Sequence, residues 1–385
     1  MKIAILGSRG IPCRMGGFER YAEEIGARLA KMGHQVTVYC ENGNSPAPRP
    51  AELRGMRLVH LPHLSGKLGE ALSFDLLSCA HSAFQDYDVV YMLGFGWGYF
   101  CLLPRLAGKT VVVNMDGMEW QRGKWNWLGK AVLLAARNAS LQIAQHLVCD
   151  SRAMLDYYRD NFRGDFHYLS YGADVRDVPL SPRWRTLGFE PRRYATVVCR
   201  FEPENNLDLV LDEYLASSCP LPLAVVGGST YPGNPLTRRL AETRDPRIVA
   251  VGVVSDQAQL AGLRANALLH VHGHEVGGTN PSLLDAMGLG NVVAAMDVPY
   301  NREVLGEAGL FFTKEPGDLR RTIDSVWRDP GAFDSLREAA RDRIRAHYDW
   351  DLAARRHDEF FRSLAPRASN GRRPRREPRA PMRQS

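Results

Sequence analysis

The sequence predicts an α/β protein built from two open parallel sheets in tandem. Short runs rich in β-branched residues alternate with amphipathic segments of helical length along almost the whole chain, which is typical of βα units. The alternation lapses over residues 171–190, a stretch of Gly, Pro, Ser and charged residues, and then resumes. A chain of 385 residues, 45% hydrophobic and 24% charged, is long enough for two soluble domains, which excludes disorder throughout.

The β-branched runs predict two sets of strands. In the first half of the chain we expect strands at residues 2–6, 35–40, 56–61, 89–93, 110–114, 146–149 and 166–169. In the second half we expect them at residues 195–199, 221–226, 247–251, 267–271 and 291–295. Helices fill the gaps, and their patterns are clearest over residues 17–31 and 128–144.

Four segments follow from this pattern. We expect a first Rossmann-like, doubly wound domain over residues 1–175, a second over 176–348, and one further helix over 349–364. Residues 365–385 are rich in Arg, Pro, Gly and Ser and are expected to be disordered, because this composition cannot bury a core. Parallel sheets bind ligands at the carboxyl ends of their strands, so the active site is expected in a cleft between the two domains.

Charge and cysteine content narrow the class of protein. The net charge is +6, but residues 366–385 alone hold seven arginines and one glutamate, so the rest is close to neutral and a nucleic-acid-binding core is disfavoured. The seven cysteines are scattered without a Cys-x-x-Cys pair, which indicates neither a disulfide framework nor a thiolate zinc site and fits a reducing cytoplasm. No export signal is visible, and the longest uncharged stretch, 89–104, is shorter than the roughly 20 residues of a membrane helix.

The first motif, GSRGIPCRMGGFE, spans residues 7–19 between the first expected strand and the first expected helix. Its glycines allow a ligand to approach the backbone, and Gly16 and Gly17 at the helix N-terminus offer amides and the positive end of the helix dipole to a phosphate. The spacing differs from G-x-G-x-x-G, so a dinucleotide site is disfavoured. A purely structural glycine turn is the alternative.

The second motif, NMDGMEWQRGKWNW, spans residues 114–127 after the fifth expected strand. Asp116 and Glu119 beside Trp120 offer hydroxyl-binding carboxylates next to an apolar platform, as a sugar ring requires. The alternative is an aspartate in a turn with an aromatic core cluster. Basic residues interleaved with tryptophans, which could contact an anionic membrane surface or remain solvated, are Arg122, Lys124, Trp125, Trp127 and Lys130.

The third motif, VVCRFEPENN, places Arg200 at the end of the first strand of the second domain. A guanidinium at this position can hold a diphosphate bidentately and stabilise its charge as it leaves. An interdomain salt bridge is the alternative.

The fourth motif, HGHEVGGTNPSLLDAM, spans residues 272–287. Two glycines free the backbone after a strand, Asn280 can cap a helix and Pro281 can open it. Asp285 lies about one turn into that helix and can accept hydrogen bonds from ribose hydroxyls. A structural strand–loop–helix junction is the alternative. Three clustered groups without a fourth ligand are weak support for a metal, and we expect none at His272, His274 and Glu275.

These four segments, in this order, resemble glycosyltransferase family 4, whose members have the GT-B architecture of two Rossmann-like domains facing a cleft. The resemblance covers residues 1–364, and the expected last helix is similar to the family's crossover helix, which packs back on the first domain. Within the family the segments look like bacterial rhamnosyltransferases of capsule and cell-wall polysaccharide assembly.

The resemblance implies a retaining, metal-independent transfer from a nucleotide-diphosphate sugar, best dTDP-β-L-rhamnose, to a polyprenyl-diphosphate-linked or other saccharide acceptor. It implies no further cofactor and no dedicated base, because the leaving phosphate would accept the acceptor's proton. Asp116 and Arg200 would serve catalysis, and Glu119 and Trp120 would bind the acceptor. The residues that would bind the donor are Gly16, Gly17, Gly277, Gly278, Thr279, Asn280, Ser282, Leu283 and Asp285. Of these, the amides around Ser282 and Leu283 would hold the diphosphate and Asp285 the ribose.

Three positions depart from the family's usual pattern. Gly277 and Asp285 stand where the family commonly has two glutamates, and Asn205 stands where it has a diphosphate-binding lysine. Losing one cation from a desolvated diphosphate site could cost several kcal/mol, for which Arg302 or Arg9 could compensate.

Two rival functions fit the same motifs. One is a nucleotide-sugar epimerase that needs no acceptor, and the other is a noncatalytic nucleotide-sugar-binding protein of an assembly complex. For all three functions the cytoplasm is the expected location. The arginine-rich segment 366–385 fits contact with the inner face of the plasma membrane, or a solvated extension.

Overall fold

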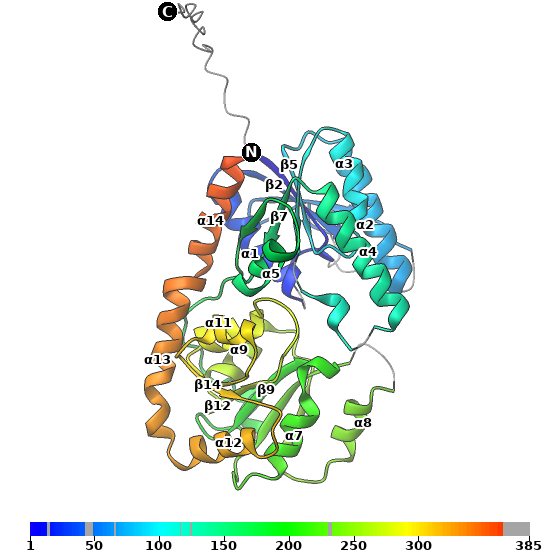
Figure 1. Ribbon diagram of the computed structural model, residues 1–385. Helices are drawn as coiled ribbons and strands as arrows, with labels where there is room; N and C mark the ends of the chain where they lie inside the picture. The colour runs from blue at the N-terminus through cyan, green and yellow to red at the C-terminus, as the bar shows by residue number, and fades with distance from the viewer. Residues whose placement is uncertain are drawn as a thin grey trace, which may run out of the picture.

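The computed structural model describes residues 1–13, 16–42, 49–64, 67–115, 117–123, 125–229 and 233–364. It shows two α/β domains, one above the other in Figure 1, each with a parallel sheet covered by helices on both faces. The expected fold class is therefore confirmed.

The first sheet has eight strands in the order β3-β4-β2-β1-β5-β6-β7-β8, and only the β3–β4 pair is antiparallel. Its strands are β1 (Lys2–Leu6), β2 (Gln35–Glu41), β3 (Glu52–Leu53), β4 (Met56–Leu61), β5 (Val89–Leu93), β6 (Thr110–Asn114), β7 (His146–Cys149) and β8 (Phe166–Tyr168). Its helices are α1 (Gly17–Lys31), α2 (Lys67–Ala83), α3 (Leu102–Leu106), α4 (Trp127–Ile143) and α5 (Arg152–Asn161). The two-residue edge strand β3 was not predicted, because two residues show no alternation.

The second sheet has six parallel strands in the order β11-β10-β9-β12-β13-β14. Its strands are β9 (Ala195–Arg200), β10 (Leu223–Gly228), β11 (Ile248–Gly252), β12 (Leu269–His272), β13 (Val292–Met296) and β14 (Leu310–Phe312). Its helices are α6 (Pro182–Thr186), α7 (Leu207–Leu215), α8 (Pro235–Glu242), α9 (Gln257–Ala265), α10 (Pro281–Gly288), α11 (Pro299–Leu305), α12 (Asp318–Arg328) and α13 (Asp334–Arg343). The chain crosses between the sheets from Tyr168 to Ala195, and the expected boundary falls inside that segment.

Strand order locates the ligand site. In the first sheet the order reverses between β1 and β5, and in the second between β9 and β12. Open parallel sheets bind ligands at such switch points, outside the carboxyl ends of the strands. The first motif begins directly after β1, the third runs through the end of β9, and the fourth begins at the last residue of β12, so three of the four motifs lie at the ends of switch-point strands.

The last described helix, α14 (Trp350–Ser363), leaves the second domain and packs against α1 of the first, as Figure 1 shows along one side of the molecule. Asp349 caps it, since its side chain accepts hydrogen bonds from the N–H groups of Asp351 (2.9 Å) and Leu352 (3.0 Å). None of the helices in the described part of the chain has the length and apolar character needed to span a bilayer.

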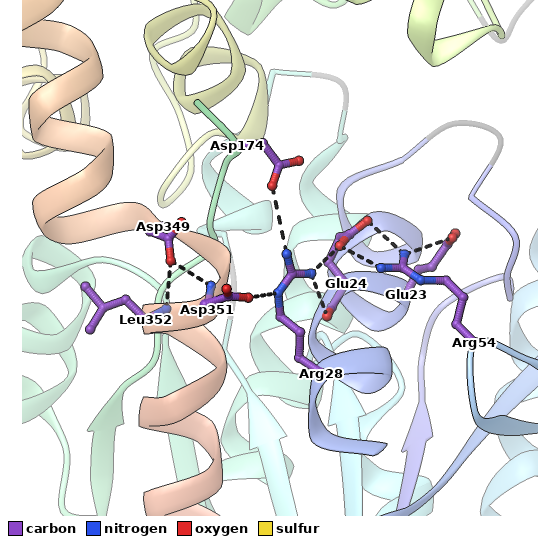
Figure 2. Close-up of polar contacts among 8 residues, drawn as sticks. All are labelled: Glu23, Glu24, Arg28, Arg54, Asp174, Asp349, Asp351 and Leu352. Carbon is purple, nitrogen blue, oxygen red and sulfur yellow. Dashed lines mark hydrogen bonds and ion pairs between the residues drawn. The ribbon is translucent and has the colours of Figure 1, made fainter. Parts of the chain in front are cut away.

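Arg28 of α1 contacts both α14 and the segment in which the chain passes from the first sheet to the second, as Figure 2 shows. Its Nε lies 2.6 Å from an oxygen of Asp351, its Nη1 pairs with Glu24, and its Nη2 lies 3.9 Å from Asp174 in the crossing segment. Arg54 also pairs with Glu24, at 2.9 Å. One guanidinium thus contacts the helix, the crossing segment and the first domain together.

Gly172 is expected to be essential for the packing of α14, because the first residue of this helix, Trp350, lies directly against it. A Cβ at this position would lie 2.9 Å from the backbone Cα of Trp350 and 2.7 Å from its ring, so Gly172→Ala should shift the helix and lower the free energy of unfolding by about 1–3 kcal/mol. Chemical denaturation measures this. Gly96→Ala is the matched control, because a Cβ there meets nothing within 4 Å. Equal stability of the two variants would contradict the packing described.

Candidate functional site

The loop before α1 and the start of α10 meet across the two domains. A Cβ added at Gly17 would lie 3.4 Å from Cγ of Pro281, and the Thr279 hydroxyl donates to the backbone carbonyl of Asp150, at the end of β7, at 2.7 Å. A Cβ at Gly278 would lie 2.0 Å from the buried carboxylate of Asp150, so only glycine fits there. Gly17 of the first motif and Gly278 of the fourth are therefore positions of close approach between domains.

The N-terminus of α10 has the predicted cap. The Asn280 side chain accepts a hydrogen bond from the Ser282 N–H at 2.9 Å, and the Leu283 N–H donates to the Asn280 carbonyl at 3.0 Å. The two amides expected to hold a diphosphate are thus engaged within the helix, and the Leu283 side chain is buried in the core. In contrast, the N–H groups of Gly277 and Gly278 find no acceptor among the residues that the structure describes. These two amides are therefore unused hydrogen-bond donors on buried glycines.

Asp285 is held by two arginines that the sequence did not single out. Its Oδ2 lies 2.6 Å from Nη1 of Arg20, on α1 of the first domain, and 3.1 Å from Nη1 of Arg264, on α9. Arg264 is buried and also donates to the Ser282 hydroxyl at 2.6 Å. Burial lowers the pKa of Arg264, which the Asp285 carboxylate opposes, and Asp285 raises the pKa of Arg20. The other oxygen, Oδ1, accepts no hydrogen bond within the described ranges.

Arg200 lies exposed at the carboxyl end of β9, and no ion pair or hydrogen bond joins its guanidinium to a described residue. Asn205, five residues later, is buried and fully used: its Nδ2 donates to the Arg200 carbonyl at 2.7 Å, and its Oδ1 lies 2.6 Å from Nδ1 of His274. Asn205 therefore links the end of β9 to the loop after β12. Its side-chain amide is used in these two hydrogen bonds and not in contacts with a ligand.

Arg302 and Arg9, the two arginines that could replace the charge of the missing lysine, differ in their surroundings. Arg302 pairs with Asp297 through both ends of its guanidinium, one contact being 2.6 Å, and stacks over Phe311. It is therefore engaged elsewhere. Arg9 is exposed, and its N–H donates to Glu19 at 3.0 Å.

The segment after β6 contributes an interdomain ion pair. Glu119 lies 2.7 Å from Nε of Arg122, whose Nη1 lies 3.2 Å from the buried carboxylate of Glu204 in the second domain. The ring of Trp120 is half-buried against Phe95, with ring centroids 5.7 Å apart. These surroundings match the alternative interpretation of the second motif, in which its tryptophan belongs to an aromatic core cluster. Asp116 lies outside the described residues.

His272, the last residue of β12, is buried, and His274 in the following loop is half-buried. Burial lowers the pKa of His272 to about 3 and that of His274 well below its usual value, the latter with help from the positive charges of Arg122 and Arg200. Glu275 pairs with Lys314 at 2.6 Å. Within the described residues, the one group of three that could hold a metal ion is elsewhere, at the amino ends of β7 and β8: His146, Asp165 and His167.

Comparisons with known proteins fit this geometry. Residues 15–176 match the family model described as Glycosyltransferase Family 4. No curated protein sequence matches the chain.

Solved structures match over almost the full chain. Sucrose-phosphate synthase from Thermosynechococcus elongatus has a TM-score of 0.80 at 19% identity, covering 94% of this chain and 98% of that one. HepE of Anabaena, in complex with UDP and glucose, has a TM-score of 0.76 at 17% identity, covering 94% and 100%. A glycosyltransferase from Rickettsia africae has a TM-score of 0.71 at 13% identity, covering 95% and 99%. The fold is GT-B. At such low identity the likeness of these GT-B structures extends to the fold alone.

Placing a lysine at position 205, as the resemblance to glycosyltransferase family 4 would suggest, is expected to damage this site. Asn205→Lys removes two buried hydrogen bonds, so it should lower the free energy of unfolding by about 1–3 kcal/mol without strengthening nucleotide binding. Thermal denaturation and calorimetry with nucleoside diphosphates measure the two effects. Asn138→Lys on the exposed side of α4 is the control for the charge added. A stable Asn205→Lys variant with tighter nucleotide binding would contradict the role assigned to Asn205.

Proposed function

We propose that this protein is a retaining, metal-independent glycosyltransferase that transfers a sugar from a nucleotide-diphosphate donor to a lipid-diphosphate-linked saccharide. The observation that carries the proposal is the exposed Arg200 guanidinium at the carboxyl end of β9, at the β9–β12 switch point, where its charge acts on His274 in the loop that leads to Gly277 and Gly278. The GT-B fold and the family match over residues 15–176 support the reaction class.

The leaving diphosphate would be held by charge and by amides. Arg200 would bind it bidentately, and the N–H groups of Gly277 and Gly278 would donate to its oxygens as negative charge develops. Gly16 and Gly17 would approach from the first domain, where Gly17 already lies against Pro281. In this reaction the leaving phosphate oxygen accepts the proton of the acceptor hydroxyl, so no side chain is assigned as base.

Asp285 would bind the ribose through its free oxygen. Oδ2 remains with Arg264, which needs a counter-charge because it is buried, while Oδ1 accepts the ribose hydroxyls. Thr279 and Asn280 would shape the loop around the donor sugar. Asp116 would position the reacting groups, and Glu119 and Trp120 would border the acceptor on the first-domain side.

The donor sugar we propose is L-rhamnose, carried by dTDP, on the basis of the motif resemblance. HepE of Anabaena has been solved with UDP-glucose, so UDP-glucose belongs in the same test. The purified protein is incubated with labelled nucleotide sugars and a polyprenyl-diphosphate-linked saccharide, and the products are identified by mass spectrometry. NMR of the new linkage then tests retention.

Each outcome of this test separates the candidates. Absence of transfer from every donor would overturn the proposed function. Turnover of donor without an acceptor would indicate an epimerase instead. Nucleotide binding by calorimetry without any turnover would indicate a noncatalytic binding protein.

Arg200→Ala is expected to lower kcat/KM by about 100-fold or more, because it removes the cation that stabilises the leaving group. Arg200→Lys should retain part of the activity, as a point charge without bidentate geometry. Stability should be unchanged, since the side chain is exposed and unpaired among the described residues. Arg185→Ala, an exposed arginine on α6, is the matched control, and full activity of Arg200→Ala would refute the assignment.

A further inference from the structure

Two histidines and an aspartate come together at the amino ends of two neighbouring strands of the first sheet. His146 begins β7, Asp165 stands directly before β8, and His167 is the second residue of β8. Nδ1 of His146 lies 2.7 Å from Oδ2 of Asp165, and Nε2 of His167 lies 3.0 Å from the same oxygen. The three ligand atoms lie within 4.8 Å of one another, which holds for no other such group in the described part of the chain.

The backbone fixes this arrangement. Strands β7 and β8 pair in parallel, with Leu147 opposite Phe166, and the Leu147 N–H donates to the Asp165 carbonyl at 2.9 Å. Asp165 and His167 are two residues apart, so the alternation of a strand directs their side chains to the same face of the sheet. The pairing brings His146 beside Asp165. The three side chains are therefore held by paired strands, which position ligands more precisely than a loop does.

The hydrogen bonds of the cluster leave one imidazole nitrogen unused. His146 and Asp165 are joined by a hydrogen bond, but Nε2 of His167 forms none with a described residue, although this nitrogen is buried and close to Asp165. A buried polar nitrogen without a hydrogen bond is rare in folded proteins and requires an explanation. Two ligands of one metal ion lie beside each other while each points at the ion, and the contact between His167 and Asp165 has this form.

The donor set suits a transition metal ion. Imidazole nitrogens and a carboxylate are typical ligands of Zn²⁺, and three protein ligands with one water complete a tetrahedral site. With bonds of about 2.0–2.2 Å, the ligand atoms of such a site lie roughly 3.3 Å apart. The contacts of 2.7 and 3.0 Å are slightly shorter than this, and the Asp165 side chain is 56% exposed, so its carboxylate is free to rotate and admit an ion from solvent.

The cluster also supports the last helix. The Phe360 ring of α14 packs against both imidazoles, with its centroid 4.6 Å from that of His167 and 6.0 Å from that of His146. Asp358 of the same helix lies 2.6 Å from Nε2 of His34, directly before β2. The helix thus rests on the amino ends of several strands. An ion that fixes the two imidazoles would also fix the surface on which Phe360 packs.

We propose that His146, Asp165 and His167 bind one Zn²⁺ ion through Nδ1, Oδ2 and Nε2, with water as the fourth ligand. The ion links β7 to β8 and stabilises the packing of α14 through Phe360. Mg²⁺ and Ca²⁺ are disfavoured at this site, because both ions prefer oxygen ligands and two of the three ligands here are imidazoles.

This site lies at the opposite end of β7 from the cleft. His146 begins the strand, and Asp150, whose carbonyl accepts the Thr279 hydroxyl of the second domain, follows its carboxyl end. Four residues of extended strand separate His146 from Asp150, which corresponds to about 13 Å. The ion therefore does not contact a donor in the cleft, and the metal-independent transfer proposed above does not require it. Metal binding is tested separately from sugar transfer.

Calorimetric titration of the full chain with Zn²⁺ tests the proposal, after a chelator has removed metal and with a phosphine reductant to keep the cysteines reduced. One equivalent should bind, and excess Zn²⁺ should raise Tm by about 2 °C or more. Asp165→Asn and His167→Gln should each weaken binding about tenfold or more, since each removes a ligand. His347→Gln is the matched control, because this histidine is exposed and lies outside the cluster. Mg²⁺ at the same concentration should leave Tm unchanged.

Co²⁺ in place of Zn²⁺ separates this site from the cysteines. Absorption bands of four-coordinate Co²⁺ are expected without thiolate charge-transfer bands, and they should be lost in Asp165→Asn. This variant also decides the outcome if His167→Gln fails to fold, because the Asp165 side chain is the most exposed of the three.

Three results would overturn the proposal. The first is that the chelator-treated chain binds no Zn²⁺, and the second is that Asp165→Asn binds it as tightly as His347→Gln does. The third is a Co²⁺ spectrum with thiolate bands, which would assign the bound ion to cysteines. In each case the cluster would be a hydrogen-bonded support for α14 only.

Discussion

The candidate site depends on a buried guanidinium that needs a carboxylate. Arg264 is 5% exposed within the second domain, and a buried cation without a partner would be costly. Asp285 supplies the counter-charge and Ser282 a further acceptor, and both come from the first turns of α10. This pairing fixes the start of α10 against α9, and with it the direction of the turn through Gly277 and Gly278. The same carboxylate oxygen also accepts a hydrogen bond from Arg20, so the first domain contacts the second at the start of α10, next to this turn.

Polar contacts join the two domains, in addition to an apolar cluster that contains buried residues of both. The Glu303 carboxylate accepts the N–H groups of Arg152 and Ala153 at 2.8–3.1 Å, which places an anion at the N-terminus of α5 in the other domain. The Thr279 hydroxyl and the Arg122–Glu204 pair also cross the cleft. Such contacts can exchange partners with a polar ligand at small cost, whereas a large apolar interface could not. These polar pairs would have to exchange partners for the domains to separate here, while α14 and Arg28 also connect the two domains.

Local patterns made the fold predictable, and long-range pairs limited the prediction of the site. Buried parallel strands form β-branched runs, so most of them were placed within two residues, and the helix cap at Asn280 followed from residue type and position alone. Strand β14 was missed because three residues, LFF, show no period. Arg20 and Arg264 were missed because their contact with Asp285 spans up to 265 residues of sequence, and an arginine in a helix gives no sign of its partner. The surroundings of Trp120 and the engagement of Arg302 with Asp297 depend on packing that residue types do not reveal.

The distribution of positive charge indicates how a diphosphate would have to be bound. Arg264, Arg122 and Arg302 are each matched by a carboxylate, and position 205 is a neutral amide that links two loops, so Arg200 is the second-domain cation left over among these groups. One guanidinium balances only part of a diphosphate's charge. The remainder would fall to backbone N–H groups and helix dipoles, which come from Gly277 and Gly278 in one domain and from Gly16 and Gly17 in the other. A site whose hydrogen-bond donors come from both domains binds the leaving group fully only when the domains are close together. Binding of the donor and closure of the cleft would then be one event, so the interdomain contacts of Asp285 and Thr279 would belong to the binding step itself.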